Sequence, residues 1–464
     1  MSVARRAIDD IALRVLSRGF DEYGFFAKPA DFTPTLPCAF FRDAAGDIQH
    51  DMDFTQYTGG TALYVNYDTG NDTSGDGSSG TPYKTVQKAL IVAEAGGDAA
   101  YCVKVTSDTA FPRNTFWRST QYSFTDKTIA VIPDNTSGRI IAHYGETTRA
   151  WVADENVWKS TRSVARSVFD MDDLDDNGLP KPYTGVVDLA SCKATSKTWY
   201  TDETYVWVNT ADGLVPDNAK ILVGVGVTNI AVLLGTSKLY LEGITHIGAS
   251  NNNDPLSIRG DLTGASTVGH FVAKDCNFLG GNLVYAATSA GNAIATAAVE
   301  SAYFFDCRAA YGRRDGFNLH YSQVTTNDRR GCLGLFYGCE SYDNGTADAG
   351  TGSDNAFTSH EGASQLIIAS EGYNCRGPLL INVNGCYSIA VDCNMRDNVY
   401  GGAAYQFTTD TPGGGGDGKA ILINCTHDGE TLSTTDLNTD AAMAVYLIGS
   451  DLTNVGSGSV VTVR

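Results

Sequence analysis

The phrase Tyr303-Phe-Phe-Asp-Cys307 returns one repeat later as Leu335-Phe-Tyr-Gly-Cys339. Each copy is a short apolar run, then a turn residue, then in most copies a cysteine. The other copies are Leu239–Gly243, Phe271–Cys276, Leu366–Gly372, Ile389–Cys393 and Ile421–Cys425, so successive copies end 33, 31, 32, 33, 21 and 32 residues apart. A period of about 20–50 residues built of strands and turns predicts a stacked β solenoid, in which each coil buries its apolar face against the next.

Length and charge restrict the class of protein further. The chain has 464 residues, which is long for one compact domain, but a solenoid grows coil by coil and escapes that limit. A net charge of −20 argues against nucleic acid or an anionic membrane surface as a partner. The sequence has no run of 18 apolar residues, so it predicts no membrane-spanning helix.

Eleven cysteines are present, and five of them share one phase of the repeat. This phase predicts small side chains in the core, so we expect five free, buried thiols: Cys276, Cys307, Cys339, Cys393 and Cys425. No two cysteines have CxxC spacing, which argues against a metal site. The N-terminal residues Met1–Arg6 lead into Ile8–Ile11 rather than into an apolar run, so we expect no signal peptide.

Residues 61–93 carry a family resemblance. The strand Thr61–Tyr67 is followed by the Gly/Asp/Ser-rich loop Asp68–Gly80 and by Thr81–Ala93, with Pro82 at a helix-opening position. This arrangement resembles the first segment of right-handed parallel β-helix proteins of the pectate-lyase-like superfamily. The resemblance implies that the helix caps the solenoid, because an uncapped first coil would expose an apolar disc and a free sheet edge.

The sequence therefore predicts an all-β fold: a right-handed parallel β-helix (solenoid) with an N-terminal capping helix and a small inserted β domain. We expect an amphipathic helix at 4–18 within an attachment or neck segment, 1–60. The start of the β-helix with its capping helix follows at 61–144, the inserted domain at 145–222 and the main parallel β-helix at 223–464. Trp-rich alternating strands mark the insertion, as in the hairpin Trp199–Val208. These tryptophans either fill a small core or stack on sugar rings.

Two consecutive coils interrupt the apolar pattern with charged and polar residues. Aligning Phe317 with Phe357 places His320 level with His360. Like positions of neighbouring strands project side by side about 4.7–4.9 Å apart. We therefore expect one outward-facing groove with the catalytic candidates Asp315, His320, Asp354, His360 and Glu361 and the substrate-binding candidates Arg313, Asn318, Tyr321, Arg329 and Asn355. The alternative is a surface histidine ladder with acids that only cap turns.

Such a group of residues suits the cleavage of a glycosidic bond. Hydrolysis needs a protonated acid at the leaving oxygen and a second carboxylate as base or nucleophile. A lyase would instead need a base such as His320 or His360, and a cation such as Arg313 or Ca²⁺ to neutralise a uronate.

Hydrolysis requires no cofactor, and we expect no metal among the candidate site residues. Ca²⁺ remains an option at two acidic loops. Asp173–Gly178 begins like an EF-hand loop but has Thr184 at position twelve, and the second loop offers Asp68, Asp72 and Asp76.

The family resemblance implies a glycan-degrading protein most like a bacteriophage tailspike or depolymerase. Such a protein binds a host surface polysaccharide and cleaves it, here by glycoside hydrolysis with carboxylates. A polysaccharide lyase with a His base and a non-catalytic glycan-binding or structural fibre protein are the alternatives. The resemblance also implies a homotrimer in the virion tail or outside the cell, attached to other tail proteins through its N-terminal segment.

Overall fold

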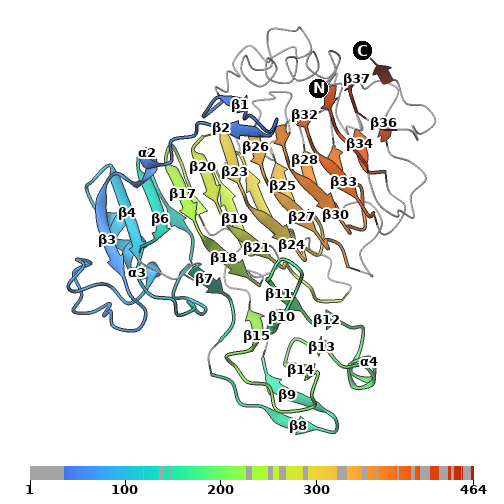
Figure 1. Ribbon diagram of the computed structural model, residues 1–464. Helices are drawn as coiled ribbons and strands as arrows, with labels where there is room; N and C mark the ends of the chain where they lie inside the picture. The colour runs from blue at the N-terminus through green and yellow to red at the C-terminus, as the bar shows by residue number, and fades with distance from the viewer. Residues whose placement is uncertain are drawn as a thin grey trace.

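The computed structural model is a stack of parallel strands wound into a right-handed solenoid (Figure 1). It describes residues 36–463 except 119, 135–139, 147, 163, 226–231, 249–253, 261–267, 286–290, 321–331, 347–353, 361–362, 384–385, 399–402, 408–418, 428–436, 440–443, 451 and 453–460. Most coils contribute one strand to each of three parallel sheets. The predicted all-β, right-handed parallel β-helix is thus confirmed. The expected helix at 4–18 lies outside the described residues.

The three sheets differ in length. The twelve-stranded sheet contains β3 (Thr61–Val65), β4 (Ala100–Val105), β6 (Thr128–Pro133), β17 (Lys238–Glu242), β20 (His270–Lys274), β23 (Ser301–Phe305), β26 (Leu333–Tyr337), β29 (Ser364–Ile368), β32 (Tyr387–Val391), β35 (Lys419–Ile423), β37 (Ala444–Ile448) and β38 (Val461–Val463). The seven-stranded sheet contains β7 (Ile140–His143), β18 (Ile244–Ile247), β21 (Asn277–Leu279), β24 (Arg308–Ala310), β27 (Glu340–Tyr342), β30 (Glu371–Tyr373) and β33 (Asn394–Arg396). The nine-stranded sheet contains β5 (Tyr122–Ser123), β16 (Val232–Leu233), β19 (Leu256–Arg259), β22 (Ile294–Ala297), β25 (Phe317–His320), β28 (Phe357–His360), β31 (Leu380–Asn382), β34 (Tyr405–Phe407) and β36 (Leu437–Thr439).

The turn residue of the repeated phrase bends the chain from the twelve-stranded to the seven-stranded sheet. At Asp306 and Gly338 the backbone φ is 52° and 61°, in the left-handed region. Gly, Asn and Asp adopt this conformation most readily, which explains why they recur at this point of each coil. Ala369 holds the same position with φ 47°, a backbone conformation that is unfavourable for an alanine side chain.

The residue after this turn points into the core, and the series forms the cysteine ladder: Cys276, Cys307, Cys339, Ser370, Cys393 and Cys425. All five cysteines are free and buried, as predicted. Their thiols donate to backbone carbonyls, as Cys307 Sγ does to Phe305 O at 3.3 Å. Burial raises the pKa of the Cys307 thiol well above its usual value. The cysteine ladder is therefore neutral and hydrogen-bonded.

Helix α3 (Val86–Ala95) lies at the N-terminal end of the solenoid, against β3, β4 and β5 (Figure 1). It begins at the N-cap Thr85, whose side chain accepts a hydrogen bond from the Lys88 backbone N–H. One face of α3 joins the solenoid core through Val86, Ala89, Leu90 and Ala93. No helix in the described part of the chain combines the length and apolar character needed to cross a membrane.

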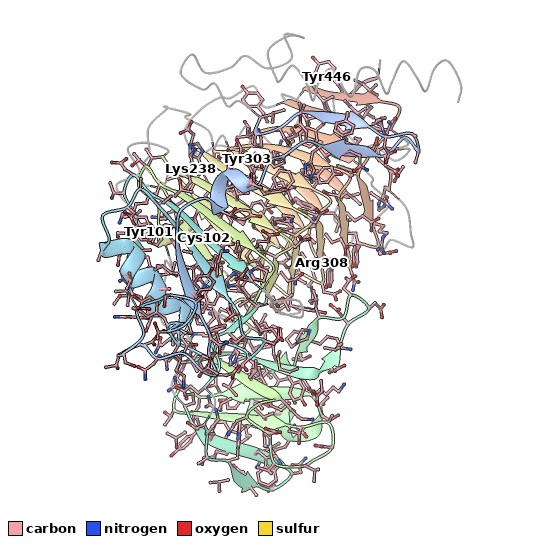
Figure 2. The ribbon with its side chains drawn as sticks, turned by 60° about the vertical axis from the view of Figure 1, so that its left-hand side comes forward. Tyr101, Cys102, Lys238, Tyr303, Arg308 and Tyr446 are labelled. Atoms are coloured by element: carbon pink, nitrogen blue, oxygen red, sulfur yellow. The ribbon has the colours of Figure 1, made fainter. Side chains whose placement is uncertain are left out.

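Residues 36–58, called here the N-terminal strap, cover part of the outer face of the twelve-stranded sheet. The strap holds the antiparallel pair β1 (Phe40–Arg42) and β2 (Ile48–His50) and the short helix α2 (Thr55–Thr58). This face of the sheet is apolar, unlike an ordinary solvent-facing surface, and includes Tyr303 and Tyr446 (Figure 2). Because the strap packs on this face, many of the side chains on the outer face of the sheet are buried.

Residues 152–225 leave the coil pattern and form two small, mostly antiparallel sheets. One contains β10 (Ala165–Leu174), β11 (Pro180–Pro182) and β15 (Ile221–Val225). The other contains β8 (Val152–Asp154), β9 (Val157–Thr161), β12 (Thr184–Gly185), β13 (Thr198–Thr201) and β14 (Tyr205–Asn209), with helix α4 (Leu189–Ala194) beside it. The predicted hairpin is β13–β14. Trp199 and Trp207 are 1% and 6% exposed, so both fill cores rather than face solvent.

Candidate active site on the nine-stranded sheet

Strands β25 and β28 carry the predicted histidines in the predicted register. Phe317 pairs with Phe357, and His320 pairs with His360. The two Phe rings stack in the core with centroids 5.4 Å apart. The two imidazoles stack on the opposite face, 4.4 Å apart and nearly parallel. One rung of the solenoid therefore separates the histidines.

Asp315 lies at the start of β25 and is held by three donors. Its Oδ1 accepts from the backbone N–H of Asn355 at 3.1 Å and from Asn355 Nδ2 at 2.8 Å. Its Oδ2 accepts from Asn318 Nδ2 and lies 4.0 Å from His360 Nε2. These contacts join Asp315, Asn318, Asn355 and His360 in one network on two adjacent coils.

The network continues into earlier coils as a series that we call the acid ladder: Asp254, Asn292, Asp315 and Asn355. Each member precedes its strand by two residues, and its side-chain oxygen accepts the backbone N–H of the next member. The distances are 2.7 Å from Asn292 N to Asp254 Oδ1 and 3.2 Å from Asp315 N to Asn292 Oδ1. Asp315 thus has a structural role, which is the turn-capping alternative considered from the sequence.

Asp354, next to the acid ladder, differs from Asp315. It is fully buried, and neither of its carboxyl oxygens has a hydrogen-bond partner among the described residues. Burial, and then the charge of Asp315, raise the pKa of Asp354 to about 7, against the opposing charges of Arg314, Arg376 and Arg313. A carboxyl group in this state carries a proton near neutral pH and can donate it.

Asp254, at the other end of the acid ladder, was not expected from the sequence. Burial is the main cause that raises its pKa to about 7, and the charge of Asp315 adds to it. Hydrogen bonds from Asn292 act in the opposite direction. The carboxyl groups of Asp254 and Asp354, whose pKa values are raised, thus lie on either side of Asp315, whose carboxyl group accepts several hydrogen bonds.

Five of the seven candidate residues that the structure describes are buried, so these five do not line an open groove. Asp315, Asn318, Asp354 and Asn355 are each at most 4% exposed. Ladder hydrogen bonds hold Asp315 and Asn355 against the adjacent coils. Arg313 is 3% exposed and its Nη1 donates to Val284 O at 2.8 Å. Three further candidates lie outside the described residues: Tyr321, Arg329 and Glu361.

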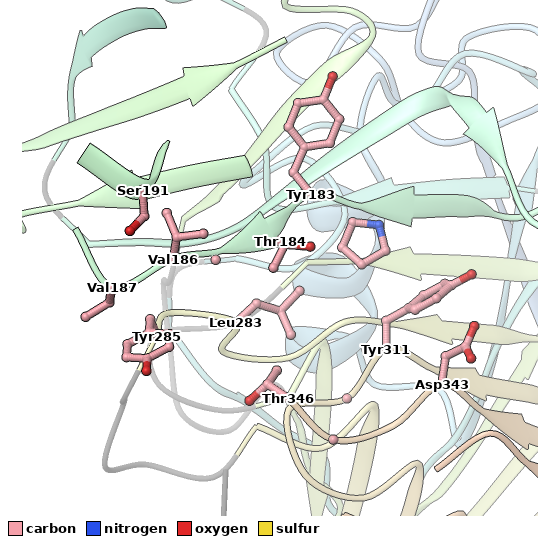
Figure 3. A pocket seen from close by; sticks show the side chains of 14 residues that line it. Tyr183, Thr184, Val186, Val187, Ser191, Leu283, Tyr285, Tyr311, Asp343 and Thr346 are labelled. Carbon is pink, nitrogen blue, oxygen red and sulfur yellow. The ribbon is translucent and has the colours of Figure 1, made fainter. Parts of the chain in front are cut away.

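A cavity of about 410 Å³ lies beside the site, between the inserted strands and the turns of the solenoid (Figure 3). Its lining residues are Pro182, Tyr183, Thr184, Gly185, Val186, Val187, Ser191, Leu283, Tyr285, Tyr311, Gly312, Asp343, Gly345 and Thr346. Gly185 allows the two walls to meet, because a Cβ there would lie 2.3 Å from Leu283 O. A Cβ on Gly345 would lie 2.6 Å from Asp354 Cβ, so one glycine separates the cavity from this carboxyl group.

A second cavity of about 230 Å³ shares Gly185, Val186, Val187 and Tyr285 with the first. Trp199 lines it, and the Trp199 Nε1 atom is buried without a hydrogen-bond partner. Tyr285 is 40% exposed where the two cavities meet. Neither cavity was predicted from the sequence, although the insertion that forms one wall was.

The EF-hand-like run Asp173–Gly178 is the tight turn between β10 and β11. Asp175 Oδ1 accepts the backbone N–H groups of Asn177 and Leu179 at 2.9 and 2.8 Å. Asp175 Oδ2 accepts the hydroxyls of Tyr311 and Tyr342 at 2.7 and 2.6 Å. A cation at Asp175 would have to displace these donors, and the Ca²⁺ assignment stays a prediction.

The three parallel sheets define a class: this chain is a parallel β-helix protein. No protein-family model and no curated protein matches the sequence. Among solved structures, a glycoside hydrolase is similar with a TM-score of 0.49 and 10% identity over 85% of this chain and 96% of the other. Pectate lyase Pel9A is similar with a TM-score of 0.40 and 10% identity over 86% and 78% of the two chains. Tailspike protein gp49 of Acinetobacter baumannii bacteriophage Fri1, a capsular polysaccharide depolymerase, has a TM-score of 0.35 and 13% identity over 93% and 68%.

Proposed function

We propose that this chain binds and cleaves a polysaccharide by glycoside hydrolysis, with Asp354 as the general acid. The observation that supports this role is the raised pKa of Asp354, about 7, in a carboxyl group one glycine away from a cavity. A buried, perturbed carboxyl beside a cavity with aromatic walls is a combination typical of active sites. A general acid works best when its pKa lies near the operating pH.

In this proposal Asp354 gives its proton to the glycosidic oxygen as the bond from that oxygen to the anomeric carbon breaks and its electron pair passes to the oxygen. Asp315 is the second carboxylate. It either takes a proton from the water that attacks the anomeric carbon or attacks that carbon itself, and water then releases the sugar. Because Asp354 is buried, substrate reaches it only if the turn at Gly345 moves aside.

The cavity supplies the place for the sugar chain. Tyr285 offers an accessible ring, while Thr184, Ser191 and Thr346 offer hydroxyls. Rings with an apolar face and a polar edge suit a ligand that has both kinds of surface. On the basis of the sequence resemblance, we propose a host-surface polysaccharide as the substrate and a homotrimer of the virion tail as the functional form. If the protein sediments as a monomer, the trimer is wrong.

A polysaccharide lyase is the second candidate. The observation in its favour is His360 Nε2, which lies 4.0 Å from Asp315 Oδ2 and stacks on His320. A carboxylate beside an imidazole orients it as a base. In a lyase the base removes the proton next to a uronate carboxyl group. The electron pair of that C–H bond forms a double bond to the neighbouring carbon, as the glycosidic oxygen leaves that carbon with its bonding pair and takes up a proton.

The test is incubation of the protein with capsular polysaccharides, lipopolysaccharide and polygalacturonate, followed by mass spectrometry of the released oligosaccharides. Hydrolysis adds one water per bond cut, whereas a lyase product absorbs ultraviolet light. Asp354→Asn should lower turnover by about 10²–10⁴-fold, the usual size of general acid–base help. Asp254→Asn is the matched control, because it removes a carboxyl group with a similar pKa from an earlier coil, whereas Asp354 packs against the cavity residue Gly345. Full activity of Asp354→Asn would exclude the proposed acid.

A further inference from the structure

Three arginines converge on one glutamate where the chain leaves the solenoid for the inserted strands. Arg113 Nη1 lies 3.0 Å and Arg162 Nη2 lies 2.8 Å from Glu146 Oε1. Arg149 Nη2 lies 3.6 Å from Glu146 Oε2. The four residues, called here the arginine cluster, come from a turn of the first coils, from the connection after β7 and from the end of β9.

The arginine cluster leaves many donors unused. Among the described residues, no hydrogen-bond partner reaches the buried Nε atoms of Arg113 and Arg162 or either Nη atom of Arg149, and Arg162 Nη2 has only its ion-pair contact with Glu146. The Arg149 side chain is only 4% exposed, so water does not replace the missing acceptors over most of its surface. A buried donor without an acceptor costs stability, and a charged donor costs more.

The charges of the arginine cluster do not balance. Three guanidinium groups face one carboxylate, which leaves two positive charges in a chain whose net charge is −20. Burial, and then repulsion by Arg162, lower the pKa of Arg149 to about 10, while Glu146 acts against this shift. Ion pairs that served only to hold the insertion against the solenoid would be expected to have all their donors hydrogen-bonded and their charges balanced.

We infer that the arginine cluster is a binding site for a doubly charged tetrahedral oxyanion, a sulfate or phosphate group. Guanidinium groups bind such oxygens in pairs through their planar forks of N–H groups. An oxyanion with two negative charges would neutralise the surplus and supply acceptors to the four remaining nitrogen atoms. Arg113, Arg162 and Glu146 are 23%, 19% and 31% exposed, so the cluster is open to solvent on one side.

The source of the oxyanion is either a free ion or a substituent on a sugar, because both present the same oxygens. Binding at this place would also join the first coils to the inserted strands, since the ligand bridges Arg113 and Arg162. The site is independent of Asp354, which lies on a different sheet and in later coils. A lack of glycan cleavage would therefore not bear on it.

The test is isothermal titration of the whole protein with sodium sulfate and with sodium phosphate, against sodium chloride at equal ionic strength. Sulfate and phosphate also stabilise proteins without a site, so thermal shifts alone do not decide. Arg149→Gln should weaken binding of either ion about tenfold or more, because it removes a charged donor pair. Arg118→Gln is the matched control, since Arg118 already forms hydrogen bonds of 2.6 and 2.9 Å with Glu94 and should leave affinity unchanged.

Two results would overturn the inference: no saturable binding of sulfate or phosphate, or equal binding by the wild type and by Arg149→Gln. If Arg149→Gln does not fold, Arg113→Gln replaces it, because Arg113 is closer to the surface. Titration with glucose 6-phosphate separates the two sources. Affinity equal to that of inorganic phosphate assigns the site to a sugar substituent, and no binding assigns it to the free ion.

Discussion

The cysteine ladder and the acid ladder use the same geometry to opposite effect. Both place one side chain per coil at a bend of the chain and join the coils through hydrogen bonds to backbone groups. The cysteine ladder is neutral and its thiols are hydrogen-bonded. The acid ladder holds Asp254 and Asp315 next to the unpartnered Asp354. A solenoid needs only the first kind of ladder for stability, so the charge buried in the second kind points to function.

The sharpest way to break this comparison is to remove one member from each ladder. Asp315→Ala leaves two donors of Asn355 and one of Asn318 without an acceptor, so we expect a loss of about 3 kcal/mol or more. Cys307→Ala removes one buried sulfur from the core and should cost only about 1 kcal/mol. Urea unfolding followed by circular dichroism measures both, and Asp315→Asn controls for shape. Equal losses in the two alanine variants would remove the distinction between the ladders.

A second prediction concerns pH and Asp254. Its pKa is about 7 in the folded chain and near the ordinary aspartate value of 3.8 when unfolded, so the folded state binds more protons between these values. The stability it contributes is complete below pH 3.8 and is lost as the pH rises toward 7. Asp254→Asn keeps an acceptor in the ladder, as Asn292 and Asn355 do, and should flatten this decline by up to about 1.4 kcal/mol per unit of pKa shift. Unfolding midpoints at pH 4 and pH 8 test it, and parallel curves for wild type and variant would show that folding does not raise the pKa of Asp254.

A third prediction separates the two carboxyls with raised pKa values. If Asp354 acts as a protonated acid, kcat/KM should fall as the pH rises above about 7, where Asp354 loses its proton. Asp254→Asn should leave that limb of the profile in place, apart from a small shift. A pH series with one cleavable polysaccharide measures the profile. Loss of the limb in Asp254→Asn would transfer the acid role to Asp254.

The smallest expected effect lies in the turns that feed the cysteine ladder. Ala369 has φ 47°, where glycine is free of the strain that a Cβ brings. Ala369→Gly should therefore stabilise the solenoid by about 1 kcal/mol, seen as a higher urea midpoint. Gly338→Ala, at φ 61°, is the reciprocal control and should destabilise it. A Cβ there would also lie 2.4 Å from Asp306 Oδ1.

Local repeats in the sequence were enough to predict the coils, the free thiols and the register of Phe317 with Phe357. These features depend on a short repeated phrase and on the spacing between its copies, and both are visible in the sequence. Asp254 and Asn292 were not predicted from the sequence, because the strands of the nine-stranded sheet before β25 are unevenly spaced along the chain. Their alignment with Asp315 is therefore visible only in three dimensions. The burial of Asp315 also depends on Asn355, forty residues later.

The cavity could not be predicted for a different reason. Its walls are Thr184–Val187 on one side and turns of later coils on the other, and their contact depends on how the insertion folds back. Nothing in the sequence around Gly185 indicates the contact between these two walls. The arginine cluster likewise joins Arg113, Arg149 and Arg162 across the start of the insertion.

The N-terminal strap has a consequence for how the chain reaches this fold. A solenoid can grow by adding coils from any starting point, since each coil contacts only its neighbours. The strap ties early residues to late ones: Tyr337 donates to Ile48 O at 2.6 Å, and Arg42 Nη1 lies 2.7 Å from Asp392 Oδ2 across 350 positions of sequence. Closing such a loop is slow, because its entropy is lost before the contact forms. The strap therefore docks late, on a sheet that is already assembled, and makes distant coils unfold together.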